Sequence, residues 1–470
     1  MTDNGHVVAP ASFTRRVASL AWPILVGQLA VISNGVIDTV MTARYSATDL
    51  AALGLGASIY VSFFVGLSGV MQALSPVIGQ LYGAKKHEAI GDEVRQGLWL
   101  ALFLSAIGCL LLVFPQILLD IAKAPPALEE RVREYLRLLA LALPATLGFR
   151  IYASLNTATS RPRMVMLIQV AGLLAKIPLN ALFIFGAPDL LGLPALGTPG
   201  CAIATTITAW LAVIVAWVIV RRGQHYQQFR LFGSGLGRPV WRAQAELLKL
   251  GVPMGLSYLI EVTAFTFMAL FIARLGNETL AAHQITANFG TVLYMLPLSI
   301  ANATGTLVAQ EIGAGRLAAA RHAGKAGVRL GALLAVGVGI MVWLLREVII
   351  GGYTPDAKVA AAAMPLFFFI AFYQLFDAWQ VGTAYVLRAY KVATVPTILY
   401  AFALWGVGLG GGYLMGFDVL GGTPAMLQGA AGFWLGNSLS LALVALALSW
   451  YLRHIQRLQE EEDRVLRAQG

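Results

Sequence analysis

Long apolar stretches, separated by short polar segments, run along the whole chain. Each stretch has about 20 or more residues, which is the length that an α-helix needs to cross ~30 Å of hydrocarbon. A transmembrane β-barrel would instead show short strands of alternating polarity. The pattern therefore predicts twelve transmembrane helices, at residues 15–43, 48–82, 92–121, 129–155, 162–186, 199–222, 243–275, 279–312, 317–350, 355–388, 394–415 and 424–457.

The composition agrees with a membrane protein, because 58% of the 470 residues are hydrophobic, 12% are charged and the mean hydropathy is +0.73. The net charge of +10 would also suit a nucleic-acid-binding protein. With the N-terminus placed inside, however, most Lys and Arg residues, Arg388 among them, fall in cytoplasmic segments. The charge therefore indicates topology: we expect a multi-pass protein of the cell inner membrane, with both termini cytoplasmic, membrane lipid around it and no nucleic-acid partner.

Cysteine usage and the N-terminal segment add two smaller expectations. Cys109 and Cys201 both lie in predicted helices, so we expect packing residues and no disulfide. The first apolar segment follows Arg15 and Arg16 directly and is long enough to span the membrane, so we expect no cleavable signal peptide.

The chain contains an internal repeat. Residues 20–97 align without a gap with residues 250–327, and the loop "QLYGAKK" corresponds to "QEIGAGR". Because each copy holds six helices, an even number, both copies enter the membrane in the same orientation. The predicted fold is an all-α integral membrane protein with two parallel-related six-helix lobes. We place these lobes at residues 1–222 and 243–457, with a cytoplasmic linker at 223–242 and a cytoplasmic tail at 458–470.

Acidic residues inside apolar helices are the main candidates for function. Glu261, in "LSYLIEVTAFTFMALF", and Asp377, in "YQLFDAWQ", fall near the middle of their predicted helices, and Tyr294 lies at a similar depth. Such acids are costly in hydrocarbon and usually mark ion or substrate sites, although hydrogen bonding between helices is the simpler alternative. Asp38 lies nearer the outer face, where Lys176, one turn from Asn180, is an available structural counter-ion.

Other chemistry is not indicated by the sequence. We find no HExxH, GxSxG or GxxxxGK[ST] motif and no metal-spaced Cys/His cluster, so we expect neither an enzyme nor a cofactor. Without a nucleotide site, uphill transport would have to use an ion gradient. Pro23 lies inside its helix and favours a kink, which indicates a role in helix shape or gating.

Several segments together resemble the multidrug and toxic compound extrusion (MATE) family, in particular its bacterial NorM branch. The segments are "AWPILVGQLAVISNGVIDTVMTARYSATDLAALGLGAS", "SPVIGQLYGAKK", "KIPLN", "LGVPMGLSYLIE", "LAAHQ" and "VLRAYKVATVP". The resemblance covers nearly the whole chain. It implies alternating access and export of organic-cation drugs and other antimicrobials, coupled to inward flow of sodium ions or protons, by a protein that we expect to act as a monomer.

The resemblance also implies roles for individual residues. Glu261 and Asp377 are similar to the coupling-cation site, where they would hold sodium if sodium is the ion, and Tyr294 would contribute an aromatic face or oxygen. The positions similar to the family's drug-contacting residues are Asp38, Ser58, Gln284 and Asp356. Lys176 departs from the family's usual Asn, and a fixed ammonium near Asp38 argues against a sodium site in the first lobe. We interpret Pro23, Lys176 and Asn180 as structural or gating residues.

The nearest alternative is a flippase for lipid-linked saccharides, which would favour a cleft lined with Arg and Lys. Here only Arg150 and Lys176 are predicted to lie at mid-membrane depth. A second alternative is a membrane-embedded transferase with Asp38 or Glu261 as general base, which would need a second chemical group near that acid. A third is a scaffold protein, which would not need so many acids in the membrane.

Overall fold

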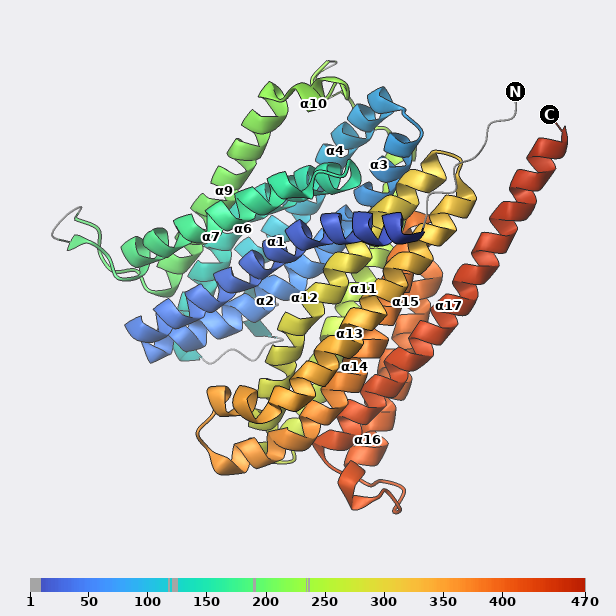
Figure 1. Cartoon of the computed structure of the whole chain (residues 1–470). Helices are drawn as coiled ribbons and strands as arrows, with labels where there is room; N and C mark the ends of the chain where they lie inside the picture. Colours follow the sequence, from blue (N-terminus) through green and yellow to red (C-terminus); the bar gives the residue numbers. More distant parts are fainter. Residues whose placement is uncertain are drawn as a thin grey trace. The chain divides into compact units, whose positions relative to one another are not determined.

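The computed structural model describes residues 10–116, 119–120, 126–188, 192–233, 235 and 237–469. Apart from one isolated bridge between Ala187 and Leu193, the regular structure of these residues is helical. Twelve helices among them are long and apolar enough to cross a membrane, which confirms the predicted number. Figure 1 shows the helices in chain order.

The chain forms two compact units, Val26–Gly255 and a second made of Met1–Leu25 with Leu256–Gly470. The first unit contains the later part of α1 and the first part of α11. Its helices are α1 (Pro10–Tyr45), α2 (Ala47–Met71), α3 (Leu74–Gly83), α4 (His87–Val113), α6 (Pro126–Ala158), α7 (Pro162–Ile184), α9 (Thr198–Arg222), α10 (Gln224–Gln227) and α11 (Trp241–Ala273).

The second unit contains the remaining parts of α1 and α11 together with the helices that follow them. These are α12 (Asn277–Gly313), α13 (Leu317–Tyr353), α14 (Ala357–Ala389), α15 (Thr394–Tyr400), the π-helix η1 (Ala401–Gly410), α16 (Gly411–Gly416), the 3₁₀-helix η2 (Ala425–Leu427) and α17 (Ala430–Gln469). The segments α15, η1 and α16 make one membrane span, Thr394–Gly416.

The unit boundaries fall inside α1 and α11, at residues 25 and 255, which are 230 residues apart, the same offset as the sequence repeat. In the second unit Phe13, Val17 and Ala21 of α1 pack into a core with α12 and α14 residues. The predicted lobes divide the chain at the linker 223–242 instead. Each boundary lies two residues beyond a proline inside the helix, Pro23 or Pro253, and the buried Pro23 leaves α1 continuous from Pro10 to Tyr45.

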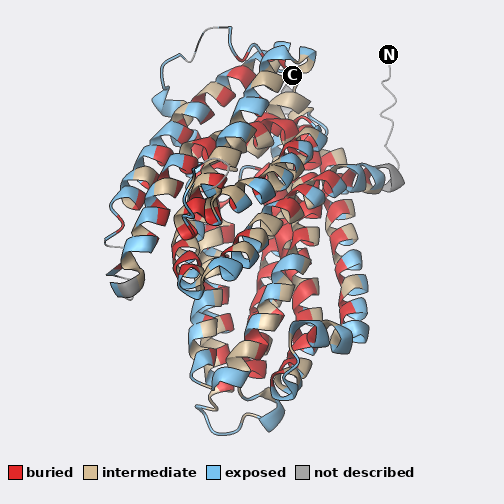
Figure 2. Ribbon diagram, turned by 90° about the vertical axis from the view of Figure 1, so that its left-hand side faces the viewer, coloured by how far each residue is buried: buried red, intermediate tan, exposed pale blue. Residues whose placement is uncertain are grey.

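The fourth helix of each repeat is the centre of its unit. In Val26–Gly255, α6 packs against α2, α4 and α9, and in the second unit α14 packs against α12, α13 and α17. The exposed sides of the helices carry large apolar residues such as Leu344 and Val348, as expected of side chains that face lipid. Figure 2 shows this division into buried and exposed sides.

Close packing between the last two spans, Thr394–Gly416 and Ala430–Val465, depends on small residues. A Cβ added at Gly412 would lie 2.9 Å from Phe433 Cδ1, and one at Gly436 would lie 2.7 Å from the Gly412 nitrogen. Glycine at these positions lets η1, α16 and α17 approach backbone to backbone, as is common where lipid supplies no hydrophobic driving force between helices.

Most predicted helix ends agree with the structure within about five residues, but three differ by more. The helix predicted to end at residue 457 continues to Gln469, so most of the predicted tail at 458–470 is helical. The helix predicted at 92–121 ends at Val113, just before Phe114 and Pro115. The helix predicted from residue 424 begins at Ala430, because Asp418 organises the preceding loop by accepting 2.9 Å hydrogen bonds from the amides of Gly422 and Thr423. Those hydrogen bonds hold the pKa of the Asp418 carboxyl below its usual value.

Candidate functional site

The two central acids of the second half lie close together within the unit Leu256–Gly470. Glu261 comes from α11 and is partly buried, whereas Asp377 comes from α14, the central helix, and is fully buried. The two carboxylates interact electrostatically, and Tyr294 of α12 interacts with both. The structure therefore brings Glu261, Asp377 and Tyr294 into one cluster built from three helices.

Asp377 has one carboxylate oxygen that is satisfied and one that is not. Its Oδ1 accepts a 2.9 Å hydrogen bond from Gln380 Nε2, and Gln380 Oε1 in turn accepts from the hydroxyl of Tyr400. Its Oδ2 is buried and has no hydrogen-bond partner among the described residues. A buried, unpartnered oxygen on an ionised group is costly, so this atom is a natural position for a cation or a proton.

The cluster includes a base that the sequence reasoning missed. Arg388 was assigned to a cytoplasmic segment, but its side chain is buried and interacts electrostatically with Glu261. Its Nη1 donates a 3.0 Å hydrogen bond to the Tyr258 hydroxyl, and its guanidinium lies over the Tyr258 and Tyr385 rings, 5.1 and 4.6 Å from their centroids. Cation–π contacts of this kind stabilise a charge that is removed from water.

With the acids ionised, Glu261, Asp377 and Arg388 together carry one net negative charge. One monovalent cation or one proton would neutralise the cluster. Oxygen ligands suit a hard cation such as sodium, and the carboxylates and the Tyr294 hydroxyl are oxygen donors. In the part of the chain that the structure describes, no three His, Cys, Asp or Glu side chains gather as a site for a transition metal.

The first unit holds a different arrangement around Asp38. Lys176 Nζ donates to Asp38 Oδ2 at 2.6 Å, and Asn180 Nδ2 donates to Asp38 Oδ1 at 2.7 Å. All three side chains are buried. Cys201 of α9, a fully buried free thiol, interacts electrostatically with Asp38. The ammonium occupies the position that a cation would otherwise take, so this geometry is that of a structural ion pair.

The remaining candidates are more exposed. Ser58 donates a 2.7 Å hydrogen bond to the Gly54 carbonyl of its own helix, and Gln284 is exposed on α12 beside the fully buried His283. Asp356 is the N-cap of α14, where its Oδ1 accepts a 2.8 Å hydrogen bond from the Lys358 amide. Asp38 and Ser58 belong to one unit, and Gln284 and Asp356 to the other.

Comparison with known proteins identifies the family. Residues 23–182 and 253–414, one segment in each repeat, match the model of the MatE family. The chain is 40% identical to the probable multidrug resistance protein NorM of Aromatoleum aromaticum, over 95% of this chain and 96% of that protein. It is 36% identical to the multidrug resistance protein NorM of Vibrio vulnificus, over 94% of this chain and 95% of that protein.

A solved structure shows the same fold. The crystal structure of the Vibrio cholerae MATE transporter VcmN in the bent form superposes with a TM-score of 0.83 at 17% identity, covering 95% of this chain and 98% of that one. The chain therefore belongs to the MatE family of membrane transporters, and its all-helical, twelve-span fold is the MATE fold. The resemblance read from the sequence is confirmed.

Proposed function

We propose that this protein is a cation-coupled antiporter that exports organic cations and antimicrobial drugs from the cytoplasm by alternating access. The observation that carries this proposal is the acid pair of the partly buried Glu261 and the buried Asp377, with the unpartnered Oδ2 of Asp377. The names of the relatives as multidrug resistance proteins support the drug class. The positive-inside charge distribution supports a multi-pass location in the inner membrane with cytoplasmic termini.

Coupling in this account follows from the net charge of the cluster. Without a bound cation, Glu261 and Asp377 repel each other in a desolvated setting, and Arg388 compensates only one of the two charges. A sodium ion or a proton bound at Asp377 Oδ2 relieves this cost. If the cation-loaded state binds drug weakly and the empty state binds it tightly, inward flow of the cation expels drug.

The available driving force is sufficient for concentrative export. A membrane potential of ~100 mV supplies about 2.3 kcal/mol for each charge that moves inward. Each tenfold cation gradient adds roughly 1.4 kcal/mol. One coupling cation per cycle, which the cluster's single net charge favours, would support a gradient of more than a hundredfold for an uncharged drug. For a monovalent organic cation the electrical contributions of the two exchanged charges cancel, so a tenfold cation gradient would support a drug gradient of about tenfold.

The Lys176–Asp38 pair argues for coupling in the second unit alone, since the ammonium already neutralises Asp38. For the same reason Lys176 is a poor anchor for the pyrophosphate of a lipid-linked saccharide. Arg150, the other base noted at mid-membrane depth, lies over the Phe64 ring at 5.5 Å from the centroid. These contacts favour the antiporter over a flippase.

The proposal is tested with purified protein in liposomes that enclose a fluorescent organic cation. Inward sodium and inward proton gradients are imposed in separate experiments, with the membrane potential clamped. Dye movement driven by one gradient, and not by an equal gradient of an unrelated cation such as choline, supports the antiporter and identifies its ion. Absence of movement under both gradients would contradict the proposal.

A further inference from the structure

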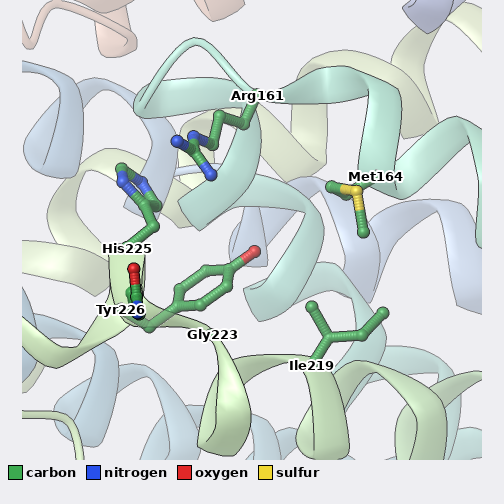
Figure 3. Close-up of a pocket in the computed structure, with 7 residues that line it drawn as sticks. Arg161, Met164, Ile219, Gly223, His225 and Tyr226 are labelled. Atoms are coloured by element: carbon green, nitrogen blue, oxygen red, sulfur yellow. The ribbon is translucent and has the colours of Figure 1, made fainter.

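A pocket of about 430 Å³ lies in the unit Val26–Gly255, outside the two acidic sites. It is formed by the start of α7, the end of α9 and the α10 turn that follows. Its lining includes the polar residues Arg161, His225 and Tyr226 and the apolar residues Met164 and Ile219 (Figure 3). In the proposed topology this is the cytoplasmic end of both helices.

Residues 223–233 form a folded segment that makes one wall of this pocket, whereas the sequence predicts a linker at 223–242. Phe229 is fully buried, and Arg95 of α4 donates hydrogen bonds to the carbonyls of Arg230 at 3.0 Å and Leu231 at 3.4 Å. Gly91 makes this packing possible, because a Cβ there would lie 2.1 Å from the Phe229 carbonyl oxygen. The Tyr226 hydroxyl donates a 2.7 Å hydrogen bond to Asn156 Oδ1.

Two nitrogen donors converge in the pocket without an acidic partner. The Arg161 guanidinium and the His225 ring point toward one another (Figure 3). Arg161 is exposed and forms no ion pair with any described residue. Gln228 Nε2 lies 3.1 Å from His225 Nδ1. An amide nitrogen can only donate, so the neutral ring carries its proton on Nε2, which is buried and has no partner among the described residues.

The electrostatics of the pocket favour an anion. Burial lowers the pKa of His225, and the positive charge of Arg161 and the neighbouring His87 lower it further. An anion between Arg161 and His225 would replace this repulsion with two charge-assisted hydrogen bonds. Arginine is well suited to such an anion when it is a phosphate, because its planar group can donate two parallel hydrogen bonds to phosphate oxygens.

We propose that this pocket binds a phosphate group that carries an organic substituent, held between Arg161 and His225. The volume lies in the range of small-molecule sites and exceeds what a bare anion fills, so room remains for a substituent along Met164 and Ile219. Two sources supply this chemistry: the headgroup of an anionic phospholipid and a soluble phosphate ester. Basic pockets between transmembrane helices on the cytoplasmic side are typical of the former.

The test measures lipid binding to the full-length protein in detergent by native mass spectrometry, with phosphatidylglycerol as the probe. Arg161→Gln should weaken binding by about tenfold, the effect of losing one charge-assisted hydrogen bond of ~1.4 kcal/mol. Arg222→Gln is the matched control, because it removes the same charge from the exposed end of α9 outside the pocket. Equal weakening in both variants, or none in Arg161→Gln, would overturn the proposal.

Two further arms make the result specific. Arg161→Lys keeps the charge but not the paired donors, and should bind more weakly than the wild type; its melting temperature shows that the fold is intact. Glycerol 1-phosphate and inorganic phosphate are added separately to the lipid titration. Displacement of the lipid by millimolar glycerol 1-phosphate identifies a soluble ester as a competent ligand, whereas displacement by neither identifies the lipid headgroup. Displacement of the lipid by inorganic phosphate at the same concentration as by glycerol 1-phosphate would contradict a site shaped for a substituent.

Discussion

Lys176 and Asp38 form a buried ion pair, with Lys176 Nζ 2.6 Å from Asp38 Oδ2. The pair joins α7 to α1, and Asn180 satisfies the second carboxylate oxygen. Both charges of the pair are removed from solvent. Each buried charge is therefore stable only while the other is present to compensate it.

Removing one partner should therefore destabilise the protein. Lys176→Met leaves Asp38 buried and uncompensated, which we expect to cost roughly 3–5 kcal/mol and to lower the melting temperature in detergent. The double variant Asp38→Asn/Lys176→Met removes both charges and should recover most of the loss. Lys325→Met, at an exposed lysine of α13, is the control and should leave the melting temperature unchanged. A Lys176→Met variant as stable as this control would show that the pair is not structural.

Arg388 should weaken cation binding at the acid pair, because a fixed positive charge beside Glu261 opposes a second one. Arg388→Gln is expected to lower the half-saturating concentration of the coupling cation by about tenfold, an effect of ~1.4 kcal/mol. Dye transport measured against cation concentration reports this value. Arg388→Lys retains the charge and should stay near the wild type, whereas a higher half-saturating concentration in Arg388→Gln would refute a repulsive role.

Gly197 should tolerate no side chain. It has a φ of 60°, and a Cβ there would lie 2.4 Å from Asp49 Oδ1, the atom that accepts a 3.0 Å hydrogen bond from the Thr198 amide. Gly197→Ala is expected to lower the free energy of unfolding by about 1–3 kcal/mol more than Gly192→Ala does. Gly192 is a matched control, since its φ is 66° but a Cβ would meet no atom within 4 Å. Equal thermal stability of the two variants would show that the close contact carries no cost.

Much of the fold was predictable from the sequence. Hydropathy predicts where the long apolar helices lie, and the repeat predicts that the chain holds two related sets of six. Glu261 and Asp377 were found for a similar reason, as charges that stand out in apolar helices. Arg388 was missed because a positive charge near the end of a transmembrane helix is typical of a residue on the cytoplasmic side. Only the structure, in which the side chain packs on Tyr258 and Tyr385, shows that it is buried. The folded segment at residues 223–233 was likewise hidden, because its polar composition is typical of a linker.

Two of the helix ends that differ have a common cause. Residues 114–121 and 424–429 continue or border apolar runs, and hydropathy does not register the turn chemistry that ends a helix. Pro115 and the hydrogen bonds of Asp418 decide those ends instead. The length of an apolar run thus predicts that a helix exists, whereas local backbone chemistry decides at which residue the helix begins or ends.

The central claim is that a cation at Glu261 and Asp377 and a bound drug oppose each other. The most direct test is the equilibrium affinity of a fluorescent organic cation for the purified protein, measured against sodium at fixed pH and against pH without sodium. One of these cations should weaken dye binding by about tenfold or more, which corresponds to a coupling free energy of at least ~1.4 kcal/mol. In Asp377→Asn and Glu261→Gln the dye affinity should no longer respond, whereas Glu278→Gln, at an exposed acid that lies 3.5 Å from Lys358, should respond as the wild type does. Full cation sensitivity in Asp377→Asn would contradict the account.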